Sequence, residues 1–143
     1  MNDELSKSFN AGKPDAIADK VRTPAQAVSA VKSGDRVFIG TACATPRSLI
    51  QALETMEEQL FDVKLIHFLT DGAIPIENGI PTTRFQHKVF FVGSDTREAI
   101  KKGKAEYIPI SIAHLPRLIE NETIPINVAM IQVSAPDSNG FVS

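Results

Sequence analysis

Four short apolar runs alternate with stretches of helical patterning along this chain of 143 residues, and this alternation constrains the fold most strongly. The runs span residues 36–40, 63–69, 88–93 and 128–133. Runs that are apolar nearly throughout are typical of strands covered on both faces by helices. No hairpin turn of the Asn-Gly type is expected between paired strands. The sequence therefore predicts an α/β domain, with a mostly parallel sheet and helices on both of its faces.

Helix signals lie between the apolar runs. Thr-Pro pairs at 23–24 and 45–46 predict two helix starts, because threonine is a good N-cap and proline fits the first helical position. Asp95 is expected to cap a third helix, and Pro116 is expected in the first turn of a fourth. After the first start, Ala27 is expected to share a buried face with the two valines that follow.

Composition fits one ordinary globular domain, since 43% of the residues are apolar and 22% are charged. We expect residues 1–20 to be a poorly ordered polar leader and residues 21–143 to form the domain. A formal charge of −2 argues against a nucleic-acid partner, and no apolar run approaches the roughly 20 residues that cross a bilayer. The single cysteine, Cys43, excludes an internal disulfide and favours a reducing compartment, so the cytoplasm is expected.

Loops that could bind a ligand follow the apolar runs, at 40–46, 70–75, 93–97 and 134–140. In a parallel sheet these loops would share one edge, beyond the carboxyl ends of the strands. Such an edge collects ligands because the N-termini of helices point their free N–H groups toward it. We therefore expect the functional site on this rim.

The loop "GTACATP", which follows the first run, is the most ligand-like of the four. Gly40 would let a ligand approach the backbone, and the small residues Thr41, Ala42 and Ala44 would leave space. The alternative is that any strand-to-helix turn in this fold needs small residues, and the sequence does not decide between them. Cys43 could be a nucleophile, although an unpaired cysteine is more often a small buried hydrophobe.

No catalytic set emerges from the remaining polar residues. His67 is interpreted as a core histidine, and the three histidines lack metal-ligand spacing, so no metal site is expected. Asp137 fits turn chemistry in "PDSNG", where Gly140 tolerates positive φ. A nucleophile, a base and an orienting group cannot be assembled, and no catalytic residue is assigned.

Three longer segments resemble a known family. They are "VKSGDRVFIGTACATPRSLIQAL", "VFFVGSDTREAIKKGKAEYIPISIAHLPRLI" and "INVAMIQVSAPDSNGFVS". Together they resemble the N-terminal half of the acetyl-CoA hydrolase/transferase family, which includes acetate and 4-hydroxybutyrate CoA-transferases. The resemblance implies an open α/β domain of the NagB/RpiA/CoA-transferase type. The family's Ser-Pro-Pro-Asp-x-x-Gly motif has Ala135 in place of its first proline here.

The resemblance also implies a two-lobed enzyme. In the family, a glutamate of the second half attacks the acyl-CoA thioester, and a carboxylate or water resolves the glutamyl-CoA thioester that forms. A coenzyme A thioester would be the substrate, and no cofactor would be tightly bound. The partners would be acyl-CoA, a small carboxylate, the C-terminal catalytic half and further copies of the chain. The nucleophile would lie outside this chain, which is expected to be inactive alone, with Ser143 a cut. No role as nucleophile is given to the glutamates of this half, Glu54, Glu57, Glu58, Glu98 and Glu106.

By position, the resemblance implies substrate-binding residues on the first loop and interface residues on the last. Gly40, Thr41, Ala42 and Cys43 would line the cleft, while Asp137 and Gly140 would shape the rim where the second half attaches. Two other classes stay open from the residues alone. One is a stand-alone module that binds a small ligand or a partner without catalysis. The other is a sugar-phosphate isomerase, which is weakened because no Lys-Asp-Glu constellation is apparent on the loops.

Overall fold

A computed structural model of the chain describes residues 19–70, 72–74, 76–77, 80–81, 83–94 and 96–143. It contains two compact units, of which the larger spans Pro24–Gln132 and the smaller combines Met1–Thr23 with Val133–Ser143. Most of the expected leader, residues 1–18, lies outside the described residues. The larger unit contains every helix and strand described below.

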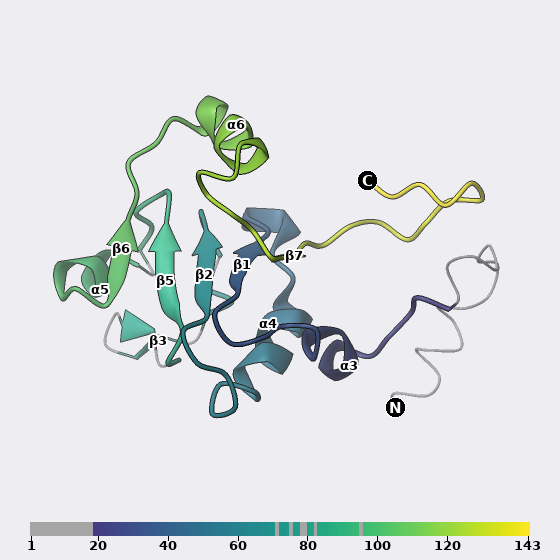
Figure 1. The fold of residues 1–143 in the computed structure, drawn as a ribbon, viewed down its shortest axis with the longest axis horizontal. Helices are drawn as coiled ribbons and strands as arrows, with labels where there is room; N and C mark the ends of the chain where they lie inside the picture. Colours follow the sequence, from purple (N-terminus) through teal and green to yellow (C-terminus); the bar gives the residue numbers. More distant parts are fainter. Residues whose placement is uncertain (1–18, 71, 75, 78–79, 82, 95) are drawn as a thin grey trace. The chain divides into compact units, whose positions relative to one another are not determined.

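A five-stranded parallel sheet forms the centre of the larger unit (Figure 1). Its strands lie in the order β6-β5-β2-β1-β7, and every neighbouring pair is parallel. The strands are β1 (Arg36–Ile39), β2 (Lys64–His67), β5 (Gln86–Val89), β6 (Ala105–Tyr107) and β7 (Val128–Met130). The predicted parallel α/β architecture is confirmed. In a parallel sheet all carboxyl ends face one edge, and this places the loops that follow β1, β2 and β5 together.

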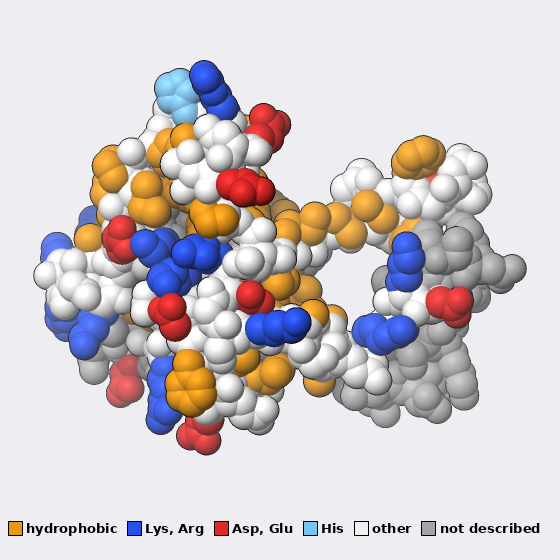
Figure 2. Space-filling view, in the orientation of Figure 1, with side chains coloured by type: hydrophobic (Ala, Val, Ile, Leu, Met, Phe, Trp, Pro, Cys, Tyr) orange, Lys and Arg blue, Asp and Glu red, His pale blue; other side chains and the backbone are white. Residues whose placement is uncertain are grey.

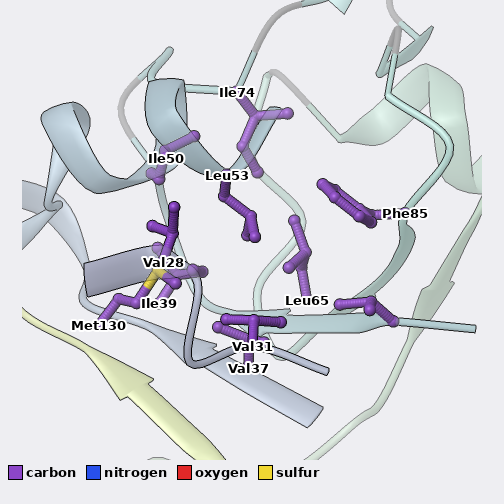
Figure 3. Close-up of a cluster of buried hydrophobic side chains, with 11 residues drawn as sticks. Val28, Val31, Val37, Ile39, Ile50, Leu53, Leu65, Ile74, Phe85 and Met130 are labelled. Carbon is purple, nitrogen blue, oxygen red and sulfur yellow. The ribbon is translucent and has the colours of Figure 1, made fainter. Parts of the chain in front are cut away.

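One face of the sheet carries the main apolar core, beneath α3 (Pro24–Val28) and α4 (Arg47–Glu54). Figure 3 shows side chains from these helices and from β1 and β2 pointing toward one another. Alternate strand residues supply this face, so Val37 and Ile39 of β1 belong to the cluster. Leu53 of α4 is only 1% exposed within it. Burial of each such side chain stabilises the fold by about 1.5–3 kcal/mol.

The opposite face packs against α6 (Leu115–Glu120), which follows the 3-10 helix η2 (Ile112–His114). The buried residues there are Ile66, Phe90 and Leu115, and partly buried apolar side chains surround them. Helices therefore cover both faces, as predicted. The remaining helix, α5 (Arg97–Lys101), leads into the edge strand β6.

The helix starts are only partly as predicted. Pro24 and Pro116 do lie in the first turns of their helices. The second helix begins at Arg47 rather than Pro46, because Thr45 ends the 3-10 helix η1 (Ala42–Ala44) and Pro46 takes the cap position of α4. Ala27 is exposed, since α3 buries only its last residue, Val28. The predicted cap at residue 95 lies outside the described residues.

A short hairpin contradicts the expectation that no Asn-Gly turn would join paired strands. The antiparallel strands β3 (Ile76–Glu77) and β4 (Ile80–Pro81) form a separate two-stranded sheet. The sequence between them is Asn-Gly at 78–79, which lies outside the described residues. Asn-Gly is the strongest short-range hairpin signal, so the sequence contained the information and the interpretation was wrong.

None of the helices in the described ranges has the length and apolar character needed to cross a membrane.

Candidate functional site

The loop after β1 is fixed to the loop after β2 by its own hydrogen bonds. The Thr41 hydroxyl donates to the carbonyl of Leu69 at 3.0 Å and accepts from the Leu69 N–H at 3.1 Å. The Ala42 N–H also donates to the Leu69 carbonyl, at 2.9 Å. Two of the four predicted rim loops therefore meet at the carboxyl edge, and Thr41 holds them together.

Gly40 is buried at the base of this loop. Its N–H donates to the carbonyl of Met130 at 2.8 Å, which continues the ladder between β1 and β7. A Cβ at this position would lie 2.3 Å from the carbonyl oxygen of Ala44 and 3.4 Å from the Cα of Ile131. A ligand was predicted to approach the backbone at Gly40, but the backbone carbonyl of Ala44 already lies there. Gly40 is thus required for internal packing, while its contact with a substrate stays a prediction.

Ala42 and Cys43 are exposed, as Thr41 is. Ala42 has φ of 49°, a left-handed conformation that costs a residue with a Cβ about 1–2 kcal/mol. Cys43 is a free, exposed cysteine, which contradicts its interpretation as a small buried hydrophobe. The loop leads directly into α4 at Arg47. Small side chains and a helix start thus lie together at the carboxyl edge, as expected for a ligand-binding loop.

His67 and His87, which are 20 residues apart in sequence, contact each other in the core. Nε2 of His67 lies 3.2 Å from Nδ1 of His87, and Nε2 of His87 lies 3.2 Å from the Thr83 hydroxyl. His67 is fully buried, which confirms its interpretation as a core histidine. Burial lowers the pKa of His67 to about 4, although a backbone hydrogen bond with Phe68 opposes the shift. His67 therefore remains uncharged at neutral pH.

Strand parity predicts that the two histidines share one face of the sheet once β2 and β5 are known to pair. Leu65 aligns with His87 across the parallel pair β2 and β5, and His67 is two residues beyond Leu65. Residues two apart point to the same face of a sheet, so both rings face the same side. The missing information was the pairing of these two strands, which lie 20 residues apart in sequence.

Three carboxylates of the larger unit have structural partners. Glu98 contacts Lys101 at 2.6 Å, Glu106 contacts Lys88 at 2.7 Å, and Glu57 accepts the N–H of Arg84 at 3.1 Å. Burial, followed by the nearby Glu57, raises the pKa of Glu54. Among the described residues, no group of three or more His, Cys, Asp or Glu side chains could hold a metal ion.

The smaller unit contains the predicted rim residues Asp137 and Gly140 in a loop that is closed by its own hydrogen bonds. The Asp137 carboxylate accepts the N–H groups of Asn139 and Phe141, at 2.8 and 2.9 Å. Gly140 has φ of 86°, and its N–H donates to the Asp137 carbonyl at 3.0 Å. The turn interpretation of "PDSNG" is confirmed, and the role of this loop in an interface stays a prediction.

Comparison with known proteins gives a consistent set of relatives. The model of the acetyl-CoA hydrolase/transferase N-terminal domain matches residues 11–143. A 4-hydroxybutyrate coenzyme A transferase of Clostridium kluyveri is 31% identical over 125 residues, which are 87% of this chain and 29% of that protein. A succinyl-CoA:acetate/propanoyl-CoA:succinate CoA transferase of Fasciola hepatica is 36% identical over 79% of this chain and 24% of its own length. The chain thus spans less than a third of these relatives.

Solved structures show the same fold. RipA from Yersinia pestis is 27% identical with a TM-score of 0.73, over 90% of this chain and 32% of its own. A 4-hydroxybutyrate CoA-transferase from Porphyromonas gingivalis is 23% identical with a TM-score of 0.57, over 86% of this chain and 27% of its own, and supports the fold alone. Because the family model covers nearly the whole chain, the chain belongs to the acetyl-CoA hydrolase/transferase family, as its N-terminal domain.

Proposed function

From this family membership we propose that the chain is one wall of the acyl-CoA cleft in an acyl-CoA:carboxylate CoA-transferase or acyl-CoA hydrolase. The observation that carries the proposal is the family match over residues 11–143, together with an exposed loop of small residues at the carboxyl edge of the sheet. Relatives that are named CoA-transferases support transfer to a carboxylate more directly than hydrolysis.

The chemistry would require a second half. In the reaction that the family resemblance implies, a glutamate of that half attacks the thioester, and CoA passes to the glutamyl carbonyl while the original acyl group leaves as its carboxylate. A second carboxylate then takes the CoA to form a new acyl-CoA, or water hydrolyses the glutamyl thioester to free CoA, and either step restores the glutamate. A carboxylate nucleophile divides a difficult acyl exchange into two easier steps. The short span of this chain relative to its relatives and the structural partners of Glu57, Glu98 and Glu106 support a nucleophile elsewhere. The longer protein would also form homo-oligomers in the cytoplasm.

In this proposal the loop Thr41–Cys43 limits the size of the acyl group. The Thr41 hydroxyl ties the loop to Leu69, so the wall is fixed before substrate binds. Ala42 and Cys43 are exposed and small, which leaves room beside the thioester. Gly40 contributes by allowing the carbonyl of Ala44 to pack closely beneath the loop. A fixed wall lowers the entropy cost of orienting the acyl carbon toward a nucleophile.

The proposal is tested by placing a larger side chain in the loop Thr41–Cys43 of the longer polypeptide that includes a second half. Cys43→Leu should lower kcat/KM for butyryl-CoA by about tenfold more than for acetyl-CoA, because a pocket discriminates each methylene by about 10- to 200-fold. Ala27→Leu is the matched control, since Ala27 is exposed on α3. If Cys43→Leu leaves the ratio of the two substrates unchanged, the wall assignment is wrong.

The present chain gives a second test. In an assay that follows exchange of CoA between acetyl-CoA and propionate, this chain alone should show no turnover. Robust turnover that is removed by a substitution within residues 1–143 would place the nucleophile in this chain and contradict the proposal.

A further inference from the structure

A polar pocket lies at the amino edge of the sheet, away from the loop Thr41–Cys43. It has a volume of about 470 Å³ and is formed between the residues before β5 and the turn into β6. Its lining includes Thr83, Arg84, Lys88, Gly103 and Lys104. Volumes of about 300–1,000 Å³ are usual for small-molecule sites. Since β5 has four residues that each rise about 3.3 Å, its two ends are about 10 Å apart, and the pocket is distinct from the rim.

The basic side chains in this pocket are incompletely neutralised. Nζ of Lys88 contacts the carboxylate of Glu106 at 2.7 Å, and this is the only carboxylate among the lining residues that the structure describes. Among the residues that the structure describes, the guanidinium of Arg84 and the ammonium of Lys104 form no ion pair. Both residues are exposed. Two positive charges thus remain available at the pocket for an anion.

The segment from Arg84 to Glu106, whose two ends line the pocket, carries an excess of basic residues. Residues 84–106 contain six basic and three acidic side chains, although the whole chain has a formal charge of −2. Figure 2 shows Lys and Arg side chains gathered around α5 and the start of β6, at the left of the view. Glu98, one of the acidic residues, is paired with Lys101 at 2.6 Å. Carboxylates also lie beside the lining, since Glu57 accepts the Arg84 N–H and Asp62 accepts from the Gln86 amide, each at 3.1 Å. The positive charge at the pocket is therefore carried by Arg84 and Lys104 themselves.

We propose that this pocket binds a small phosphate-bearing ligand through Arg84 and Lys104. A guanidinium donates two parallel hydrogen bonds to phosphate oxygens, and an ammonium adds a point charge. The Thr83 hydroxyl already contacts Nε2 of His87, so it contributes shape to the pocket rather than a free donor. The pocket holds its ligand independently of the acyl-CoA cleft, and the site does not depend on the function proposed above.

The test is a titration of the chain with pyrophosphate and with ADP, followed by the backbone amide resonances in NMR spectra. We expect saturable shifts confined to residues 83–88 and 103–106, and binding that weakens as salt is added. The double variant Arg84→Gln/Lys104→Gln should weaken binding by at least about tenfold, because charge-assisted hydrogen bonds are the strong ones. Tighter binding of ADP than of pyrophosphate would identify a nucleotide site, and equal binding a diphosphate site.

A matched control is Lys32→Gln, which removes one charge from an exposed lysine outside the pocket. It should leave both affinities within about twofold, because Lys32 does not line the pocket and the charge of an exposed lysine is screened by salt. The proposal is overturned if neither ligand shifts these resonances, if the shifts do not saturate, or if the double variant binds as well as the parent chain.

Discussion

The core beneath α3 and α4 and the loop Thr41–Ala44 lie next to each other, yet different interactions hold them. The core is an apolar cluster in which residues such as Leu53 and Val37 are excluded from water. The loop is exposed for most of its length and is held by hydrogen bonds to Leu69 and by the close approach of Gly40 to the Ala44 carbonyl. The difference teaches that stability resides mainly in the core, while the loop supplies a fixed shape.

The largest expected effect belongs to the core. Leu53→Ala should lower the free energy of unfolding by about 2–5 kcal/mol, because it removes buried methyl groups and leaves a cavity. Urea denaturation followed by far-UV circular dichroism measures this loss. Gln51→Ala on the exposed face of the same helix is the control and should change stability by less than about 0.5 kcal/mol. A similar loss in both variants would remove the contrast between core and surface.

A second effect concerns pH. The pKa of His67 is about 4 in the fold against 6.5 for an ordinary histidine, so protonation favours the unfolded chain. Stability is therefore full above pH 6.5 and falls as pH drops from 6.5 toward 4, by up to about 3 kcal/mol. Nδ1 of His87 lies 3.2 Å from Nε2 of His67, so a protonated His67 ring would face His87 in the core.

Urea unfolding at pH 7.5, 6.0 and 5.0 checks this dependence. His67→Gln keeps a side-chain nitrogen or oxygen for His87 and should flatten the profile between pH 7.5 and 5.0. The matched control is His114→Gln, because His114 is exposed in η2. An unchanged slope in His67→Gln would show that another group causes the loss of stability.

The smallest effect belongs to the loop. Thr41→Val keeps the shape of the side chain but removes the hydroxyl that bonds both backbone groups of Leu69, and should cost about 1 kcal/mol. Hydrogen exchange at the Leu69 amide should accelerate, while exchange in the core strands changes little. Thr41→Ser retains the hydroxyl and should behave as the parent chain does. Equal protection of the Leu69 amide from hydrogen exchange in all three proteins would mean that the Thr41 hydroxyl does not hold the loop.

Much of the fold was predictable from residue patterns. The apolar runs predicted four of the five parallel strands, because buried strands need apolar side chains on both faces. Proline and glycine positions predicted helix starts and turns, as at Pro116 and Gly140. Thr45 was assigned wrongly as a cap, since a 3-10 helix in residues 42–44 displaced the start of α4.

The candidate site was predictable only as a place along the chain. The sequence located a small-residue loop after the first strand, since strand-to-helix loops follow directly from the order of elements. It determined neither the hydrogen bonds between Thr41 and Leu69 nor the contact of His67 with His87. The residues of these two pairs are 28 and 20 positions apart in sequence. It also assigned the space at Gly40 to a ligand, where the Ala44 carbonyl lies.

The sequence by itself determined the class of fold, the family resemblance and the loop at the end of the first strand. These follow from local patterns, because hydrophobic periodicity and turn residues act over a few positions. The tertiary structure alone decided the strand order β6-β5-β2-β1-β7 and with it which side chains meet. Strand pairing decides such contacts because it brings distant segments within hydrogen-bond distance, and the position of a residue in sequence does not encode that distance.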